Sequence, residues 1–385
     1  MSIETQNHSK PHLTILQVLP ALKVGGVERG TVEFAIYLKQ QGHRPIIVSS
    51  GGPLVDVLLK HQITHITLGV GKKSLSSLFL IKKLKHIMID EQVDLVHARS
   101  RLPAWLSLWA IKKINKKLRP CFVTTLHGLH SVSRYSSIMA RGDAVIAVSK
   151  TAKQYLLENF KSHLNTEPEL IYRGVDQQFQ YQHQADPVWL RTFKNKLGEN
   201  DENSKTVLMP GRLSQIKGIE HLIPWLQNTR HPCKLLLTAQ INDSNYSQKV
   251  HQLFTQHQLT KHLIWLGIER NMADLYASVD MVVSVNNKAE SFGRTVLEAL
   301  SVGTPVVAFS QGGVAEIMNE LYPEGQVSAG DDMALSQRID AFLTSPPKVH
   351  SHDKFSNQAM FNQTLAVYHR LIDAKKSDVI DGEPS

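Results

Sequence analysis

The segment Gly211-Arg212-Leu213-Ser214-Gln215-Ile216-Lys217-Gly218 places two cations on a turn that is bounded by glycines. The apolar run from Val207 to Met209 predicts a strand before this turn, and Gly218 to Leu226 predicts a helix after it. A strand-to-helix turn offers an anion backbone N–H groups, the positive end of a helix and, here, fixed positive charge. The segment therefore predicts a phosphate-binding turn. A surface turn with a solvated arginine and lysine is the alternative.

Two carboxylates follow later in the chain, in Glu290-Ser291-Phe292-Gly293 and at Glu298. Met281 to Val285 predicts a strand and Gly293 to Ser301 a helix, so Glu290 lies just before a helix that it could also cap. Glu298 is flanked on both sides by Val, Leu and Ala, and a charge in such a setting needs a partner. Ribose hydroxyls can be that partner. Cations for a diphosphate and carboxylates for sugar hydroxyls together indicate a nucleotide-sugar site.

Short apolar runs alternate with amphipathic segments along the chain, which is the pattern of parallel sheets covered by helices. In the first half, the expected strands cover residues 13–19, 45–49, 65–68, 93–97, 122–126, 144–148 and 170–173. In the second half, they cover residues 207–209, 234–238, 263–266, 281–285 and 305–309. We predict the α/β class, with two doubly wound, Rossmann-like domains whose strand ends face a central cleft.

Two domains suit a chain of 385 residues, since a domain usually has roughly 100–200. The polar stretch from Gln177 to Lys205 interrupts the alternating pattern and predicts the junction. We expect an N-terminal, acceptor-side domain over residues 1–185 and a C-terminal, nucleotide-sugar-binding domain over residues 186–350. Apolar residues recur at helical spacing near the C-terminus. Residues 351–385 are therefore expected to form a helix that crosses the junction, followed by a disordered tail.

The composition, 42% hydrophobic and 20% charged, is that of a globular protein. Cys121 and Cys233 lie in apolar runs, so reduced, buried thiols are expected rather than a disulfide or a metal site. No window approaches the ~18 consecutive apolar residues of a membrane span. The first ten residues are polar and do not resemble a secretory signal, so we expect a cytoplasmic protein.

The formal net charge of +9 indicates an anionic partner, and much of the excess lies between residues 72 and 119. Basic runs of this kind are usually solvated helix surfaces. Here the lysines and arginines are interleaved with Leu, Ile, Phe and Trp, a combination that can also bind an anionic membrane surface. The protein could then be peripheral at the inner face of the cytoplasmic membrane. Nucleic acid is not expected, because no helix-turn-helix, RNA-recognition or zinc pattern accompanies the charge.

The order of these motifs resembles the large retaining glycosyltransferase family of GT-B fold, family four, which includes bacterial lipopolysaccharide-core, surface-polysaccharide and mannosyl transferases. In the second half, the resemblance extends to Gly303-Thr304-Pro305-Val306-Val307-Ala308 and to Gly312-Gly313 with Glu316. In the first half, the matching segments are Gly25-Gly26-Val27-Glu28, His127-Gly128 and Arg173-Gly174-Val175-Asp176. Arg173 departs from the family pattern, which usually has asparagine there.

The resemblance implies that Arg212 and Lys217 bind the diphosphate, Glu298 the ribose, and Glu290 the donor sugar or its phosphate. It makes His127, Arg212, Lys217 and Glu290 the catalytic residues, although a lone histidine at a strand end is more often structural. The implied donor-binding residues are Gly25, Gly26, Gly211, Ser291, Phe292, Gly293 and Glu298. No cofactor and no metal are implied, and the sequence has no Asp-x-Asp pair near a strand end.

Arg99, Arg101, Arg134 and Tyr135 follow expected strands of the first half and are candidate acceptor-binding residues for an acidic or phosphorylated glycan. The implied function is transfer of a sugar from a nucleoside-diphosphate sugar to a glycan or lipid-linked acceptor, in lipopolysaccharide-core or surface-polysaccharide synthesis. A nucleotide-sugar epimerase of the same fold and a non-catalytic nucleotide- or glycan-binding protein are the alternatives. The residues leave open the nucleotide base, the donor sugar, the acceptor, the linkage and the oligomeric state.

Overall fold

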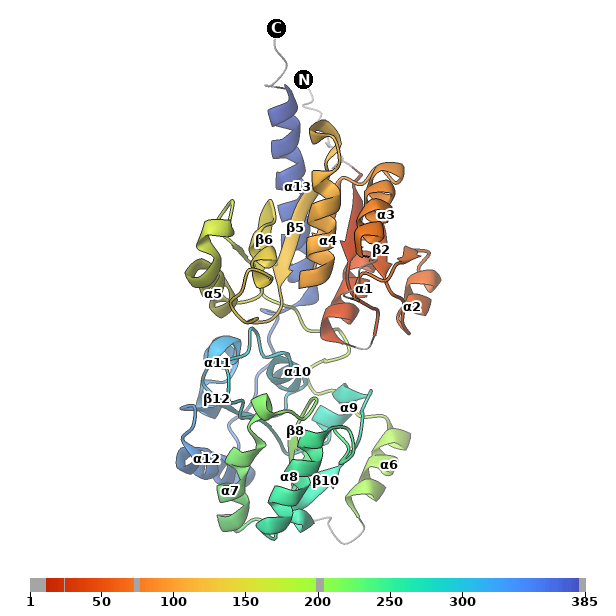
Figure 1. Cartoon of the computed structure of the whole chain (residues 1–385). Coiled ribbons are helices and arrows are strands. Elements are labelled where there is room, and N and C mark those ends of the chain that lie inside the picture. The colour runs from red at the N-terminus through yellow and green to blue at the C-terminus, as the bar shows by residue number, and fades with distance from the viewer. Residues whose placement is uncertain (1–11, 24, 73–76, 199–203, 381–385) are drawn as a thin grey trace, which may run out of the picture. The chain divides into compact units, whose positions relative to one another are not determined.

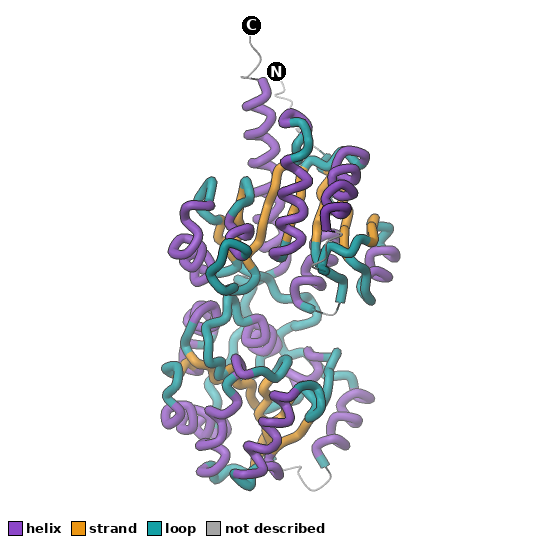
Figure 2. The backbone as a smooth tube through the Cα atoms, in the orientation of Figure 1, coloured by secondary structure: helices purple, strands orange, loops and turns teal. Residues whose placement is uncertain are grey.

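The computed structural model describes residues 12–23, 25–72, 77–198 and 204–380, which form two compact units. Unit 1 comprises Met1–Val148, Ala152–Ile171 and Phe361–Ser385, and unit 2 comprises Ser149–Thr151 and Tyr172–Met360. Each unit contains one sheet with helices packed against it (Figures 1 and 2). The α/β class predicted from the sequence is confirmed.

The sheet of unit 1 has seven strands in the order β3-β2-β1-β4-β5-β6-β7, and all neighbours pair in parallel. The strands are β1 (Thr14–Val18), β2 (Arg44–Ser49), β3 (Thr64–Thr67), β4 (Leu95–Ala98), β5 (Cys121–Leu126), β6 (Ala144–Ala147) and β7 (Glu169–Leu170). The helices are α1 (Gly26–Gln40), α2 (Val55–Lys60), α3 (Ser77–Asp90), α4 (Arg101–Lys112) and α5 (Lys150–Phe160), with short 3₁₀ turns η1 (Lys116–Leu118), η2 (Ser136–Ala140) and η3 (Lys161–His163). The strand order reverses between β1 and β4, which is where such folds bind ligands.

The sheet of unit 2 has six strands in the order β10-β9-β8-β11-β12-β13, again parallel throughout. They are β8 (Lys205–Met209), β9 (Cys233–Leu237), β10 (Leu263–Trp265), β11 (Met281–Ser284), β12 (Val306–Phe309) and β13 (Gln326–Val327). The helices are α6 (Pro187–Leu197), α7 (Ile223–Asn228), α8 (Asn245–Gln256), α9 (Met272–Ala277), α10 (Arg294–Val302), α11 (Gly312–Leu321) and α12 (Asp332–Thr344), with 3₁₀ turns η5 (Gln215–Lys217), η6 (Ile219–Leu222), η7 (Thr260–His262) and η8 (Pro323–Gly325). Here the order reverses between β8 and β11.

The last helix, α13 (Asn357–Ile380), begins in unit 2 and belongs to unit 1 from Phe361 onward. Its apolar face packs on α1, where the Phe361 ring lies 5.3 Å from that of Phe34. The Tyr37 hydroxyl donates to Asn362 over 2.6 Å, and Tyr368 lies 2.5 Å from His97 of β4. The helix is therefore part of the core of unit 1. The predicted disordered tail reaches residues 381–385, and these lie outside the described residues, as do the first eleven.

The helix expected over Gly218–Leu226 is wrong in its start and end. Gly218 adopts a left-handed conformation (φ +63°), which separates η5 from η6. The α-helical segment α7 begins only at Ile223, with Pro224 in its first turn. The turn therefore consists of two 3₁₀ segments, and the predicted helix N-terminus does not follow the strand directly.

The polar stretch from Gln177 to Lys205 contains α6, a helix that the sequence analysis missed. Asp186 caps it by accepting hydrogen bonds from the backbone N–H groups of Val188 (3.0 Å) and Trp189 (2.8 Å). Trp189 stacks on Phe193 at 5.1 Å between ring centroids. An acidic cap followed by a proline is a helix-start signal, and the polar composition of the stretch obscured it.

Candidate active site

Two loops meet at the carboxyl edge of the unit 2 sheet, where the strand order reverses. The β8 loop (residues 210–218) follows β8, and the β11 loop (residues 285–293) follows the neighbouring β11. The backbone N–H of Asn287 donates to the carbonyl of Ile216 over 2.7 Å, so the loops are in direct contact. This edge is the usual ligand position in doubly wound sheets.

Lys217 and Glu290 come together from these two loops. The Lys217 ammonium lies 3.0 Å from Oε1 of Glu290, and both side chains are partly exposed. The same oxygen accepts a 2.7 Å hydrogen bond from the side-chain amide of Asn286. A cation and a carboxylate are thus held at the point where the strand order reverses, with their positions fixed before any ligand binds.

Glycines shape the β8 loop around Lys217. Gly211 has φ +98°, and its N–H donates to the Thr238 hydroxyl over 2.7 Å. A Cβ atom at Gly211 would lie 3.9 Å from the Lys217 amine. A Cβ atom at Gly218 would lie 2.2 Å from the carbonyl oxygen of Val285, closer than any side chain can approach. The contact between the two loops therefore requires glycine at position 218.

Arg212 of the β8 loop is exposed, and the next residue, Leu213, is buried. Within the described part of the chain, the Arg212 side chain makes no hydrogen bond or ion pair with another residue. Lys217, in contrast, is engaged by Glu290. The loop thus presents one solvated cation and one that is already paired.

Glu298 lies in the second turn of α10 and is 6% exposed, as its apolar neighbours in the sequence predict. Its carboxylate has protein partners, however. Arg294 Nε lies 2.6 Å from one oxygen, and the Tyr276 hydroxyl donates to the other over 3.2 Å. The partner that a buried charge needs is therefore present within the protein, since Arg294 lies one helical turn before Glu298. Burial and this carboxylate raise the pKa of Tyr276 well above its usual value.

The remaining predicted donor residues form the start of α10. Gly293 is its left-handed N-cap (φ +99°), and a Cβ atom there would lie 2.6 Å from Val314. The Phe292 side chain is buried, with its ring 6.1 Å from that of Phe355, and Ser291 accepts a hydrogen bond from Ser149 at its carbonyl. The Phe292 ring therefore serves the core of unit 2.

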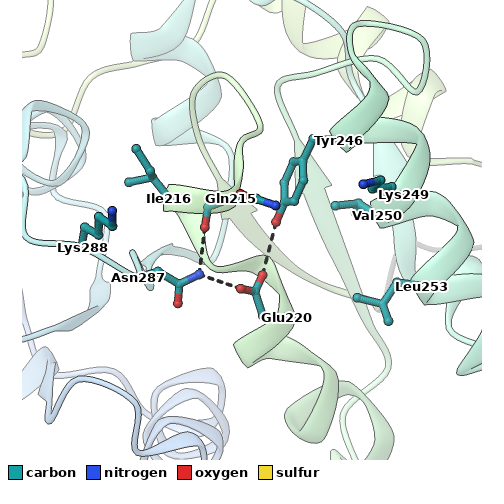
Figure 3. Close-up of a pocket in the computed structure, with 9 residues that line it drawn as sticks. All are labelled: Gln215, Ile216, Glu220, Tyr246, Lys249, Val250, Leu253, Asn287 and Lys288. Atoms are coloured by element: carbon teal, nitrogen blue, oxygen red, sulfur yellow. Dashed lines mark hydrogen bonds between the residues drawn. The ribbon is translucent and has the colours of Figure 1, made fainter.

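Asn287 joins the two loops beside a hollow of about 480 Å³ (Figure 3). Its side-chain amide donates to the Gln215 carbonyl over 2.8 Å and to a Glu220 oxygen over 2.6 Å. The other Glu220 oxygen accepts from the Tyr246 hydroxyl over 3.3 Å, and His221 Nε2 lies 2.7 Å from Asn287 Oδ1. Asn287 therefore holds the segment that carries Lys217.

Asn286 and Asn287 were missed in the sequence analysis. Both lie within three residues of the end of β11, and polar residues at the carboxyl end of a parallel strand are the available signal. Tyr276 and Arg294, the partners of Glu298, were also missed. Arg294 could have been found from its position four residues before Glu298 on the same helix.

In unit 1, the predicted glycine pair and Arg99 lie on either side of the corresponding reversal point. Gly25 is the extended N-cap of α1 and Gly26 is the first residue of this helix, which follows β1. Arg99 directly follows β4 and donates to Gln17 of β1 over 3.1 Å. Its guanidinium carbon lies 5.7 Å from the centroid of the Phe34 ring. Arg99 is thus held within unit 1 by a hydrogen bond and a ring contact.

The other predicted residues of unit 1 lie along the same sheet edge. His127 is half-buried directly after β5. Arg101 opens α4, donates to Ser136 over 3.2 Å and stacks on Tyr135 at 5.1 Å. Arg134 is exposed beside Tyr135. Arg101 and Tyr135 are therefore in contact, as candidate acceptor residues would be.

Among the described residues, no three His, Cys, Asp or Glu side chains are grouped closely enough to bind a metal ion. Cys121 and Cys233 are free, buried thiols, as predicted. No helix within the described ranges is long and apolar enough to cross a membrane.

Two family models match this chain. Glycosyltransferase Family 4 matches residues 24–179, and Glycosyl transferases group 1 matches residues 191–360. A crystal structure of a glycosyltransferase from Rickettsia africae is 32% identical with a TM-score of 0.80, and the similarity covers 94% of this chain and 99% of that one. The structure of Anabaena HepE in complex with UDP-glucose is 20% identical with a TM-score of 0.72, and the similarity covers 95% of this chain and 100% of that one. This likeness shows that the two proteins share a fold.

Two curated relatives are also similar. An uncharacterized glycosyltransferase of Methanocaldococcus jannaschii is 28% identical over 259 residues, 63% of each chain, so this chain matches less than two thirds of that relative. A lipopolysaccharide core biosynthesis mannosyltransferase of Rhizobium meliloti is 25% identical over 267 residues, 66% of this chain and 70% of its own. The family models and the Rickettsia structure, together with the two doubly wound sheets, show that the chain belongs to glycosyltransferase family 4 and has the GT-B fold.

Proposed function

We propose that this protein transfers a sugar from a nucleoside-diphosphate sugar to an acceptor hydroxyl with retention of the anomeric configuration. The observation that carries the proposal is the contact between Lys217 and Glu290 where the strand order of unit 2 reverses. The exposed Arg212 lies on the same loop as Lys217. A diphosphate needs such cations, and a sugar needs a carboxylate that accepts its hydroxyl hydrogen bonds.

In the proposed reaction, the bond between the anomeric carbon and the diphosphate oxygen breaks, and negative charge grows on the leaving diphosphate. Arg212 and Lys217 stabilise this charge, so their interactions are stronger in the transition state than in the donor complex. The acceptor oxygen bonds to the anomeric carbon on the same face. Its proton passes to the departing phosphate oxygen, which accounts for retention without a protein nucleophile.

The other roles follow from position. When the donor is bound, Lys217 contacts both the diphosphate and Glu290. The Glu290 carboxylate then accepts a hydrogen bond from a hydroxyl of the donor sugar. Glu298 accepts hydrogen bonds from the ribose hydroxyls, and its contacts with Arg294 and Tyr276 fix the orientation of its carboxylate. In unit 1, we assign the Gly25-Gly26 loop to the donor phosphate or the acceptor, His127 to the sugar, and Arg99 and Arg101 to the acceptor.

We also propose that the reaction needs no metal ion, because two cations on the β8 loop can neutralise the diphosphate. Turnover that is unchanged by EDTA is the expected result. Loss of turnover on chelation, with recovery on addition of Mg²⁺ or Mn²⁺, would refute this part of the proposal.

We propose a glycan or lipid-linked acceptor in lipopolysaccharide-core or surface-polysaccharide synthesis, with the protein peripheral at the inner face of the cytoplasmic membrane. The Rhizobium meliloti relative supports the pathway. The surface of unit 1 supports the location, because α3 and α4 lie side by side there (Figure 1). These two helices and η1 carry exposed apolar side chains, Phe79, Ile89, Trp109 and Leu118, and exposed basic ones, Lys82, Lys83, Lys112, Lys113, Lys116 and Lys117.

A thermal-shift screen with UDP, GDP and ADP sugars tests the donor assignment. Free ligand at about 100 times its Kd stabilises the folded protein by about 2.7 kcal/mol, so one nucleotide class should raise the midpoint clearly. Product analysis with that donor then separates the alternatives. An epimerase would yield isomeric sugar nucleotides without an acceptor, and a binding protein would leave the donor unchanged.

Flotation with vesicles tests the location. We expect binding to vesicles with anionic lipids at low salt and weaker binding at high salt, since α3, α4 and η1 carry exposed lysines. Absence of binding at every salt concentration would remove the membrane from the proposal.

A further inference from the structure

A second hollow, of about 470 Å³, lies on unit 1 beside α4. Its wall contains Trp105 and Trp109 of α4, Arg134 and Tyr135 before η2, Arg141 after η2, and His163 at the end of η3. Arg141 lies just before β6, at the amino end of the sheet's strands, whereas His127 follows β5 at their carboxyl end. The hollow therefore extends along the flank of unit 1, from Tyr135, which contacts Arg101, toward the amino end of the strands.

The aromatic side chains of this hollow are held in place. The Trp105 indole N–H donates to the Tyr135 carbonyl over 2.9 Å, which fixes the orientation of that ring. The Trp109 ring lies 5.2 Å from the Trp105 ring at an angle of 31°, and Trp109 remains 42% exposed. A large, oriented aromatic surface is thus open to solvent inside a concavity.

Positive charge surrounds these rings. The Arg141 guanidinium lies 5.6 Å from the Trp105 centroid, and its Nε donates to the Ser137 hydroxyl over 3.2 Å. Arg134 is exposed at the rim. Burial, and after it the Arg141 charge, lower the pKa of His163. No aspartate or glutamate is among the described residues that line the hollow, so its cations have no carboxylate partner there.

We propose that this hollow binds an acidic sugar residue of a glycan. The C–H face of a pyranose ring packs on the paired indoles, as apolar groups pack on aromatic faces. The carboxylate or phosphate of the same sugar accepts hydrogen bonds from the planar guanidinium of Arg141, with Arg134 adding charge from the rim. The indoles alone would not select this ligand, because a neutral sugar can also pack on them. The arginines alone would not select it either, because a free anion can also bind them.

The inference rests on the proposed function in one respect, namely that the glycan is part of the acceptor. Binding at the hollow itself requires neither the donor nor catalysis. The hollow extends acceptor recognition beyond the sheet edge that carries Arg99 and Arg101. An acidic sugar residue of the acceptor then determines which acceptor is used.

The test is calorimetric titration of the full chain with a hyaluronan tetrasaccharide, which carries glucuronic acid, with neutral chitotetraose, and with glucose 6-phosphate. We expect the two acidic probes to bind and chitotetraose to bind about tenfold or more weakly, the usual effect of losing one charge-assisted hydrogen bond. Trp109→Ala and Arg141→Gln should each weaken acidic-probe binding by a similar factor. Trp189→Ala and Arg191→Gln, both on α6, are the matched controls and should bind like the wild type.

Thermal midpoints verify that each variant is folded, and UDP, GDP and ADP titrations report on unit 2 separately. Loss of nucleotide binding with retained saccharide binding would count against the proposed function and not against the hollow. Three results would overturn the inference. They are equal affinity for acidic and neutral probes, undiminished acidic-probe binding in both variants, and no binding of either acidic probe at millimolar concentration. Absence of saccharide binding together with binding to anionic vesicles that Arg141→Gln abolishes would also overturn it and would identify a lipid headgroup as the occupant.

Discussion

The Lys217 ammonium lies 3.0 Å from Oε1 of Glu290, and each residue comes from a loop that follows one of two adjacent parallel strands. Replacing Glu290 by Gln removes the charge and keeps the shape. Partly exposed ion pairs stabilise proteins by about 0–1 kcal/mol, so the free energy of unfolding should change little. Turnover should fall about a hundredfold, because Lys217 and the donor sugar both lose an oriented carboxylate.

Chemical denaturation and steady-state kinetics on Glu290→Gln and wild type measure the two effects. A purely structural ion pair would give the opposite pattern, a loss of stability with turnover intact at a temperature where the variant is folded.

Arg212→Ala should lower kcat about a hundredfold by analogy with the loss of one donor to a transition-state anion. The fold should survive, since Arg212 is exposed and the buried Leu213 is unchanged. Arg230→Ala is the matched control, because Arg230 is exposed at the amino end of β9. An Arg212→Ala enzyme with the wild-type turnover number would contradict the role assigned to this side chain.

Asn287→Ala should reduce turnover by about tenfold, although no ligand contact is assigned to Asn287. Its amide holds the Gln215 carbonyl and Glu220, and a small displacement of a positioned group can cost this much rate. The neighbouring exposed Lys288 provides the control Lys288→Ala. If Asn287 positions Lys217, the double variant Asn287→Ala/Lys217→Ala should be no slower than Lys217→Ala. Additive losses would show that the two side chains act independently.

Gly218→Ala should destabilise unit 2 strongly. The left-handed conformation alone costs an alanine about 1–2 kcal/mol, and a Cβ atom 2.2 Å from the Val285 carbonyl would force the two loops apart. Gly330→Ala separates these effects, since Gly330 has φ +81° with no atom within 4 Å of the added Cβ. Calorimetric unfolding should show a much larger loss for Gly218→Ala, and equal losses would exclude the backbone contact as the cause.

Stability should depend on pH through His97, which is fully buried between Tyr368 and Thr125. Burial, and after it the Arg99 charge, lower the pKa of His97 well below 6.5. The neutral ring is therefore favoured in the folded state, and the unfolded chain takes up a proton first as the pH falls. The contribution of His97 to the free energy of unfolding is fully present above about pH 6.5. Below that pH it is lost, by up to about 1.4 kcal/mol per pH unit.

Urea denaturation of wild type and His97→Gln between pH 5 and 8 isolates this contribution from the other titrating groups. The difference in unfolding free energy between the two proteins should shrink as the pH falls below 6.5. Parallel curves over the whole range would show that His97 does not titrate differently in the two states.

The sheets could be predicted because each strand is a short apolar run between polar turns, as in β1, where all five residues are buried. The strand order of a doubly wound fold then places the loops after β8 and β11 side by side. The contact between Lys217 and Glu290 follows from that order, although its distance does not.

The rest depended on local geometry that sequence periodicity does not encode. The left-handed Gly218 replaced an expected helix start by two 3₁₀ turns, and Asp186 with Pro187 began a helix in a stretch whose polar composition indicated a linker. Arg294 and Tyr276 satisfy Glu298 within the protein, and Tyr276 comes from α9, whose packing on α10 required the tertiary structure.

In the proposed reaction, the β8 loop binds the diphosphate of a sugar nucleotide through Arg212 and Lys217. The most direct test is calorimetric titration of wild type and the double variant Arg212→Ala/Lys217→Ala with UDP, GDP and ADP, each beside its nucleoside. We expect wild type to bind one diphosphate at least about a hundredfold more tightly than the matching nucleoside, as two charge-assisted contacts imply. In the variant that advantage should disappear while nucleoside binding persists. An undiminished preference for the diphosphate in the variant would contradict the account.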